Sequence, residues 1–282
     1  MGATFIVTLR EGFEAALLLG IVYAYLAQTS LRRNHGWVTA GAALGVVASI
    51  LLGVVVSYAS GPLLDIGPDL IAAAIMLLAV GLLTWHAWWM QQHARAISGQ
   101  VHRQLDTARA TGNLSVLAVI AFTAVFREGA ETVLFLWGLM TQASMSNVDG
   151  LVGATAGVVA AAILGWLVFR GGRRVPVRRF FAITTVLLVL VAGGLLASAV
   201  GRLASLGYVP STPTLWDTSW LLSEGSGVGG FVAGLLGYRA RPTVLEMVAW
   251  ATYLAVAVLT LWRPAAPSRP AAPARSAELT SR

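Results

Sequence analysis

The sequence predicts an all-α membrane protein whose chain crosses the bilayer several times. Hydrophobic residues make up 57% of its 282 residues and charged residues only 11%, and the mean hydropathy is +0.76. A soluble domain of this size is far less apolar. The apolar residues also gather in long runs, and about 20 such residues suffice for one crossing. These two observations together predict a polytopic membrane protein.

The residue types present exclude several kinds of site. The chain has no cysteine, which excludes disulfides, thiolate metal sites and iron–sulfur clusters. Six methionines and four histidines are the remaining soft ligands, so oxygen ligands are the main resource for binding a metal. All nineteen basic residues are arginines. Most of them sit in short loops rather than in one run, so we expect these to set membrane topology and expect no nucleic-acid partner.

Seven apolar runs predict membrane spans. The first run carries its arginine and two carboxylates inside the apolar stretch, unlike a cleaved signal peptide, so we treat it as a retained helix. Residues 202–242 form a long outer loop, and the Pro/Ala-rich residues 263–282 predict a disordered cytoplasmic tail. The predicted spans are roughly 4–28, 37–59, 68–90, 114–141, 149–170, 179–201 and 243–262.

Arginines alternate between the loops that connect these spans. They follow the first, third and fifth spans, whereas residues 61–67 and 142–148 contain none. The positive-inside rule therefore puts the N-terminus outside and the C-terminus in the cytoplasm. Between the third and fourth spans, Ile97, Val101 and Leu105 recur at helical spacing. This spacing predicts a short amphipathic helix on the inner membrane surface.

Two charged motifs lie inside apolar runs. Residues 10–14 read Arg-Glu-Gly-Phe-Glu and residues 127–131 read Arg-Glu-Gly-Ala-Glu. On a helix that advances about 100° per residue, the arginine and both glutamates of each motif share one face. Each charge at mid-membrane costs on the order of 3 kcal/mol even on a lenient scale, so six of them indicate a functional site. A purely structural pair of salt bridges would leave the second glutamate of each motif unpaired.

The two motifs are related as the copies of an inverted repeat are. Under the predicted topology the first span runs inward and the fourth runs outward, yet both carry the motif, with Phe5 and Phe122 each five residues before the arginine. Three spans follow from each start. This pattern is typical of a 3+3 inverted repeat, about 1–90 and about 114–201, with a seventh helix at 243–262 appended.

The depth of the motifs in the membrane is also matched. Glu14 and Glu131 each lie about 11 residues, or about 16 Å, from the outer end of their span, and half of a ~30 Å hydrocarbon core is ~15 Å. Both motifs therefore reach the midplane. If the two helices meet there, four carboxylates and two guanidinium groups give a net charge of −2, which suits a hard cation such as iron or manganese.

Helix geometry assigns a role to each motif residue, although nothing in the sequence establishes that the first and fourth helices touch. Each arginine can hydrogen-bond the glutamate at i+4 and keep it ionised, while Gly12 and Gly129 would let the two helices approach closely. The expected cation ligands are Glu11, Glu14, Glu128 and Glu131, supported by Arg10 and Arg127.

The motifs resemble those of a known family. Arg-Glu-Gly-x-Glu in the first and fourth of seven helices looks like the REXXE motif of the oxidase-dependent iron transporter family, which contains bacterial EfeU-type permeases and the related fungal high-affinity iron permeases. Residues 84–90, which read Thr-Trp-His-Ala-Trp-Trp-Met, are also similar to bacterial members, as are the outer stretches 215–226 and 237–242. The resemblance covers about residues 1–262.

The resemblance implies a permease, not an enzyme, that moves iron inward across the cytoplasmic membrane. It implies that the four motif glutamates bind iron in transit, that the two arginines support them, and that no organic cofactor is needed. It also implies a partner system of a periplasmic iron-binding or oxidising protein and a haem peroxidase.

Two alternatives to an iron permease stay open. Carboxylates discriminate poorly among cations, so a permease for lead or manganese is the first. The second is a membrane-embedded di-iron carboxylate enzyme. Such sites usually add Glu-x-x-His ligands, and neither motif has a histidine near it in sequence.

Five further residues are candidates for the path of iron. Asp217 and Glu224 lie in the outer loop, where they hand iron over or are solvated loop charges. Glu246 begins the last span, where it receives iron at the outer mouth or closes a capping box. His86 and His93 fall at the cytoplasmic side of the predicted topology. They mark the exit or belong to an interfacial belt with neighbouring tryptophans.

Overall fold

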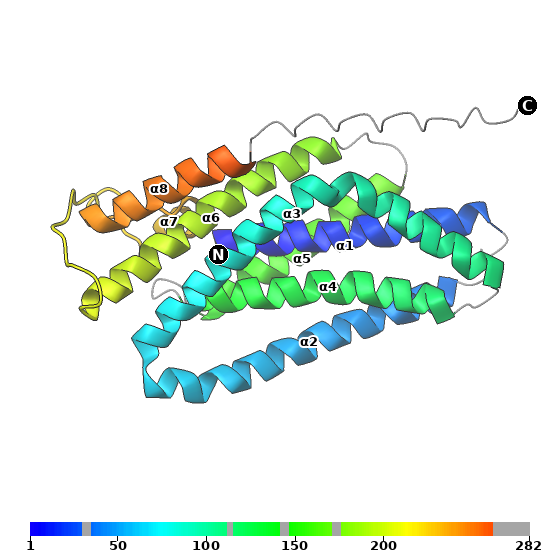
Figure 1. The fold of residues 1–282 in the computed structure, drawn as a ribbon, viewed down its shortest axis with the longest axis horizontal. Coiled ribbons are helices and arrows are strands. Elements are labelled where there is room, and N and C mark those ends of the chain that lie inside the picture. Colours follow the sequence, from blue (N-terminus) through cyan, green and yellow to red (C-terminus); the bar gives the residue numbers. More distant parts are fainter. Residues whose placement is uncertain (30–34, 112–114, 142–146, 171–175, 262–282) are drawn as a thin grey trace, which may run out of the picture.

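The structure, a computed structural model, is all-helical (Figure 1). Within the described residues, β-type pairing is limited to a single bridge between Thr214 and Thr243. The predicted tail, residues 263–282, lies outside them. The described residues are 1–29, 35–111, 115–141, 147–170 and 176–261. Their helices are α1 Gly2–Gln28, α2 His35–Ile66, α3 Pro68–Thr111, α4 Ser115–Met140, α5 Asn147–Phe169, α6 Val177–Ser205, α7 Gly227–Leu236 and α8 Val244–Leu261.

A helix accounts for each predicted span, but two helices run well beyond theirs. α2 continues to Ile66 and α3 to Thr111, so the amphipathic helix expected near residues 97–105 is the continuation of α3 and not a separate element. No proline lies between Pro68 and Pro176. Nothing in the backbone therefore forces α3 to stop at the membrane surface. Figure 1 shows α3 running obliquely across the bundle and then changing direction.

The sequence does not predict α7, which lies in the outer loop. Four of its ten residues are glycine, and each glycine lowers helix propensity by about 1 kcal/mol relative to alanine. Its ends are nevertheless well capped. The Ser226 hydroxyl accepts a hydrogen bond from the Gly229 N–H at 3.0 Å, and Gly237 adopts the left-handed conformation, with φ at 70°. The caps and the packing against α1 and α6 stabilise this helix.

The bundle is built around α1 and α4. α1 packs on α5 and α4 packs on α2, while α1 and α4 also contact each other. α3 packs on α6 and α4, and α6 runs alongside α8 (Figure 1). The two helices that carry the charged motifs are therefore covered by more apolar helices.

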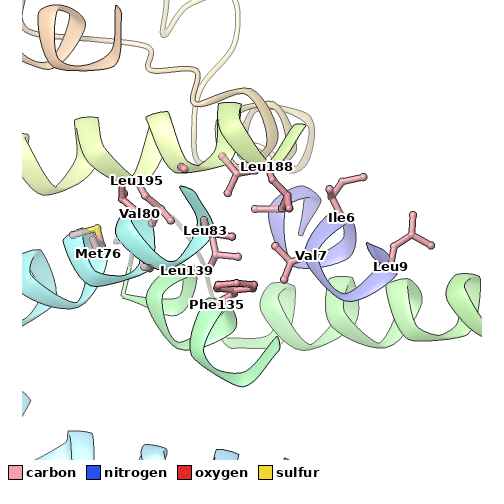
Figure 2. Packing of buried hydrophobic residues seen from close by; sticks show 14 of the residues in the cluster. Ile6, Val7, Leu9, Met76, Val80, Leu83, Phe135, Leu139, Leu188 and Leu195 are labelled. Atoms are coloured by element: carbon pink, nitrogen blue, oxygen red, sulfur yellow. The ribbon is translucent and has the colours of Figure 1, made fainter. Parts of the chain in front are cut away.

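An apolar cluster next to the motifs joins α1, α3, α4 and α6. Figure 2 shows side chains of all four helices converging. Because lipid is as apolar as these side chains, close packing rather than removal from water holds such a cluster together. Its labelled members are Ile6, Val7 and Leu9 of α1, Met76, Val80 and Leu83 of α3, Phe135 and Leu139 of α4, and Leu188 and Leu195 of α6.

Five helices of the described chain are long and apolar enough to cross a membrane. They belong to α2, α3, α5, α6 and α8, and the outward face of α2 illustrates their character: Val46, Ile50 and Val54 are 46% to 61% exposed. Such a face suits contact with lipid. α1 and α4, with 27 and 26 residues, have the length to cross but carry three charged residues each. The prediction of an all-α multi-pass membrane protein is confirmed, while the number of seven crossings stays a prediction.

Candidate metal centre

The two motifs meet in the middle of the bundle. Glu11, Glu128 and Glu131 each present a carboxylate oxygen, and these oxygens lie within 4.8 Å of one another. Glu11, Glu14 and Glu128 are at most 4% exposed, and the Glu131 side chain is 20% exposed. α1 and α4 therefore touch through their charged faces, which answers the question that the sequence leaves open.

The first motif encloses its arginine completely. Arg10 is 1% exposed, and its Nη1 donates a hydrogen bond to Glu11 Oε1 at 2.6 Å. Glu14 Oε2 lies 3.9 Å from the same nitrogen, which is an ion pair but too long for a hydrogen bond. The expected hydrogen bond from Arg10 to Glu14 is therefore wrong. The guanidinium turns instead toward α3, where it meets His86.

The second motif leaves its arginine partly outside the cluster. Arg127 Nε donates to Glu131 Oε1 at 3.2 Å, so the predicted i, i+4 bond is confirmed here, and Glu128 Oε1 lies 3.6 Å away. The guanidinium also lies over the ring of Trp89 in α3, 4.4 Å from its centroid. A cation over an aromatic face is attracted to it. The Arg127 side chain is 36% exposed.

His86 belongs to this centre, although no sequence pattern places it there. It lies in α3, is 2% exposed, and its Nε2 is hydrogen-bonded to Arg10 Nη1. Its Nδ1 contacts Glu131 Oε2, so one ring bridges the two motifs. The sequence did not predict this contact of His86 with both motifs, and a role for His86 at the exit stays a prediction. The side chain of His93 lies outside the described residues.

Much of the carboxylate surface has no hydrogen-bond partner among the described residues. Four of the eight carboxylate oxygens of the four glutamates are buried without one and also lack the contact that His86 gives Glu131 Oε2. Burying a carboxylate with too few partners costs several kcal/mol of stability. A cation placed among these oxygens would offset that cost. Oxygen donors of this kind suit hard and borderline cations. The four atoms are Glu11 Oε2, Glu14 Oε2, Glu128 Oε1 and Glu128 Oε2.

The motif glycines contact other helices than expected. A Cβ on Gly12 would lie 2.9 Å from Ala161 Cβ in α5, and a Cβ on Gly129 would lie 2.0 Å from Ser49 Oγ in α2. The prediction that these glycines let α1 approach α4 is therefore wrong. Each glycine points at least about 100° away from the charged residues of its own motif. The charged faces meet each other, and the glycine faces meet α5 and α2.

A family model matches almost the entire chain. It is the model of the Iron permease FTR1 family, and it covers residues 1–265. The chain belongs to this family. Its members are transporters rather than enzymes, so the carboxylates described above lie in a transport protein.

Curated relatives agree with this assignment. The ferrous iron permease EfeU of Escherichia coli O6:H1 is 31% identical over 94% of this chain and 96% of its own length, and the EfeU of Shigella sonnei gives the same values. The ferrous iron permease EfeU of Yersinia pestis is 29% identical over 94% of both chains. No solved structure matches the chain.

Family membership also removes the alternative of a di-iron enzyme. The sequence argument against that alternative, the absence of a nearby histidine, is wrong in three dimensions because α3 brings His86 to both motifs. The ligand set alone would leave the question open. The iron permease family decides it.

Glu246 closes a capping box at the start of α8. Its Oε2 accepts a hydrogen bond from the Thr243 N–H at 3.0 Å, and Thr243 Oγ1 accepts one from the Glu246 N–H at 3.4 Å. Oε1 pairs with Arg239 of the outer loop. The capping alternative is therefore confirmed. Glu246 is 4% exposed, with both carboxylate oxygens in use.

Asp217 and Glu224 also have partners within the outer loop. Hydrogen bonds from the Ser219 hydroxyl and N–H, together with Arg241, hold the pKa of Asp217 at about 2. Arg241 Nε lies 2.9 Å from Asp217 Oδ2. Glu224 Oε1 accepts from the Ala240 N–H at 2.7 Å. These contacts order the loop, and a role for either residue in admitting iron stays a prediction.

Proposed function

We propose that this family member is a ferrous iron permease of the cytoplasmic membrane, in which iron passes between α1 and α4 on the carboxylates of Glu11, Glu14, Glu128 and Glu131. The proposal is carried by one observation, the four buried carboxylate oxygens of Glu11, Glu14 and Glu128 that accept no hydrogen bond from the described residues. The ferrous species follows from the names of the relatives. Arg10 pairs with Glu11 and Arg127 with Glu131, so the two guanidinium groups offset part of the negative charge of the four carboxylates.

Two overlapping sets of ligands support a path rather than a single trap. Ligand atoms of Glu11, Glu14 and His86 lie within 4.8 Å of one another, and so do those of Glu11, Glu128 and Glu131. A cation could pass from the first set to the second while remaining bound to Glu11. Oxygen ligands also suit manganese, so a permease for lead or manganese is the second candidate. A competition assay distinguishes the two.

Close helix contacts support a 3+3 inverted repeat of α1–α3 and α4–α6, with α8 as the seventh span. Three glycines of α2 pack on α4, and three glycines of α5, each 112 residues further along the chain, pack on the N-terminal segment that contains α1. The residues they meet on α4 lie 117 residues after the corresponding residues of that segment, which is also the interval from Arg10 to Arg127. One packing register thus occurs twice. The contacts are Gly41 with Ala118, Gly45 with Phe122 and Gly53 with Val133 between α2 and α4, and Gly153 with Met1, Gly157 with Phe5 and Gly165 with Ala16 between α5 and α1.

These pairs favour a particular form of alternating access. The units that move are α1 with α5 and α4 with α2, since each pair is held by close glycine contacts. With the N-terminus outside and the C-terminus in the cytoplasm, the motifs lie near the midplane. The permease domain spans residues 1–262, and residues 202–242 lie on the outer side. Rocking of one pair against the other would expose the glutamates first outward and then inward.

Partner proteins are also part of the proposal. An EfeU-type permease is expected to work with a periplasmic iron-binding or oxidising protein and with a haem peroxidase. Asp217, Glu224 and Glu246 would line the outer approach, and His93 the exit. The many protein contacts of the three outer carboxylates favour a shaping role for them over direct binding of iron.

The test is uptake of Fe²⁺ by vesicles that contain the purified protein and are kept reduced with ascorbate. Glu14→Gln and Glu131→Gln each remove one ligand charge with little change in size, and we expect uptake to fall at least about tenfold in each. Asp69→Asn is the matched control, since Asp69, in the first turn of α3, pairs with Arg202 and lies outside the cluster. Full uptake in both glutamine variants would contradict the proposal.

A further inference from the structure

His86 lies between the two motifs although it belongs to neither. Its Nε2 is hydrogen-bonded to Arg10 Nη1 and lies 3.6 Å from Glu11 Oε2, while its Nδ1 contacts Glu131 Oε2. Phe135 of α4 packs against the ring, with centroids 5.8 Å apart and an interplanar angle of 77°. The imidazole is therefore held in one place, with a different carboxylate at each nitrogen.

The partners of the ring determine where its proton lies. A guanidinium group only donates hydrogen bonds, so Nε2 accepts from Arg10 and carries no proton. The ring proton then lies on Nδ1, beside the Glu131 carboxylate. A neutral imidazole with an unprotonated Nε2 is the form in which histidine binds metal ions. Here the lone pair of Nε2 accepts a hydrogen bond from Arg10, whose guanidinium also donates to Glu11.

We propose that His86 Nε2 is a ligand of the transported cation, together with Glu11 and Glu14, and that Arg10 occupies this ligand until the cation arrives. The inference rests on the proposed function and adds a nitrogen ligand to it. Ligand atoms of the three residues lie within 4.8 Å of one another. Glu11 Oε2 and Glu14 Oε2 are buried and have no hydrogen-bond partner, so two oxygens and one nitrogen surround the same space.

Arg10 can give up His86 without losing its own charge partner. Its Nη1 donates to Glu11 Oε1 at 2.6 Å, which leaves Glu11 Oε2 free for a cation. An arriving cation repels the guanidinium and competes with it for Nε2. The arginine then moves toward Glu11 Oε1 and stays paired. In this way Arg10 serves as a tethered cation that keeps the empty site neutralised.

A nitrogen ligand changes which metal ions the centre prefers. Carboxylates suit Mg²⁺, Ca²⁺ and Mn²⁺, whereas imidazole suits iron, nickel, copper and zinc. His86 therefore determines specificity, since it raises the affinity for Fe²⁺ relative to Mn²⁺ at a centre whose other ligands are all oxygens.

The experiment measures how strongly Mn²⁺ competes with Fe²⁺ uptake in reconstituted vesicles. His86→Gln keeps the bridge, because the glutamine carbonyl can accept from Arg10 and its amide can donate to Glu131, but it replaces the ligand nitrogen with oxygen. We expect Mn²⁺ to compete at least about tenfold better in this variant than in the wild type. His35→Gln is the matched control, since that ring packs on Tyr23 at 5.5 Å and not on the motifs.

A binding measurement accompanies the transport assay. Fe²⁺ is used to displace Mn²⁺ from the purified protein, and the EPR signal of free Mn²⁺ reports the displacement. This gives the preference for Fe²⁺ over Mn²⁺ even for a variant that binds but does not transport. His86→Asn serves as a second variant where the glutamine variant does not fold. An unchanged preference for Fe²⁺ over Mn²⁺ would overturn the ligand role. Absence of Fe²⁺ uptake by wild-type vesicles would instead contradict the proposed function.

Discussion

The two motifs share one residue pattern but have different surroundings. The Arg10 side chain is 1% exposed and the Arg127 side chain 36% exposed. Arg10 is bonded inward to Glu11 and His86, whereas Arg127 is bonded to Glu131 and lies over Trp89. Both His86 and Trp89 come from α3. Equal motifs therefore form unequal halves because one neighbouring helix contributes a hydrogen-bond acceptor to one arginine and an aromatic face to the other.

α6 closes the half that belongs to α1. Phe180 packs edge-on against Phe13, with centroids 4.5 Å apart, and the Phe181 ring lies 6.0 Å from the Arg10 guanidinium. In the other half the Glu131 side chain is 20% exposed. The comparison shows that the glycine contacts recur at the same intervals in both halves while the polar contacts differ. The proposed repeat is therefore compatible with an asymmetric centre.

The largest expected effect concerns the two arginines. Arg10→Ala leaves buried carboxylates without their cation, and we expect the free energy of unfolding in detergent to fall by about 3–5 kcal/mol. Arg127→Ala removes a partly exposed pair, and we expect a loss of about 1 kcal/mol or less. Denaturant titration followed by tryptophan fluorescence measures both. Equal losses would show that the two halves are equivalent after all.

A smaller effect is expected where the motif glycines meet other helices. Gly129→Ala would place a Cβ 2.6 Å from Ser49 Cβ as well as 2.0 Å from its hydroxyl, and we expect a loss of about 1–3 kcal/mol from overpacking. Gly12→Ala meets one methyl group at 2.9 Å and should cost less. The double variant Gly129→Ala/Ser49→Gly moves the glycine to the opposite helix. It should recover most of the loss, and failure to do so would refute close packing as the cause.

A still smaller effect is expected from the aromatic partners. Trp89→Leu removes the ring 4.4 Å from the Arg127 guanidinium, with an expected loss of about 0.5–1 kcal/mol. Phe181→Leu is the matched change in the other half, and its ring is 6.0 Å from Arg10. We expect it to alter that attraction less, because the attraction falls with distance. Each variant is also combined with alanine at its arginine, and all are measured by denaturant titration. The resulting double-mutant cycles give the coupling free energy between each arginine and its ring.

The smallest expected effect on stability is in the outer loop, at Asp217. The pKa of Asp217 is lowered to about 2 from its ordinary value of 3.8, chiefly by Ser219. A lowered pKa means that the ionised form stabilises the folded protein above the ordinary value and loses this effect as the pH falls toward the lowered value. The shift in unfolding temperature of Asp217→Asn should thus be small and equal at about pH 7 and about pH 5. A shift that disappears by about pH 5 would contradict the Ser219 contacts.

Local spacing was sufficient to predict much of this molecule. The helices, the shared face of each charged motif and the capping box of Glu246 all depend on residues a few positions apart, and the structure agrees with these predictions. α7 was not predicted, because its glycines give it a low helix propensity and it is stabilised by its caps and its packing instead. The bond from Arg10 to Glu14 was predicted from spacing alone and is wrong, since His86 draws the guanidinium to another side.

Residue order along the chain is enough to show which residues carry charge, that they recur in two motifs, and that each motif forms one helical face, because helix geometry relates neighbours in the chain. The contact of α1 with α4, the packing of Gly12 on α5 and of Gly129 on α2, and the position of His86 between the two motifs become visible only in the folded protein. His86 is 76 residues from Arg10. Over such a separation contact depends on how whole helices pack and tilt, and the spacing of residues within one helix carries no information about that.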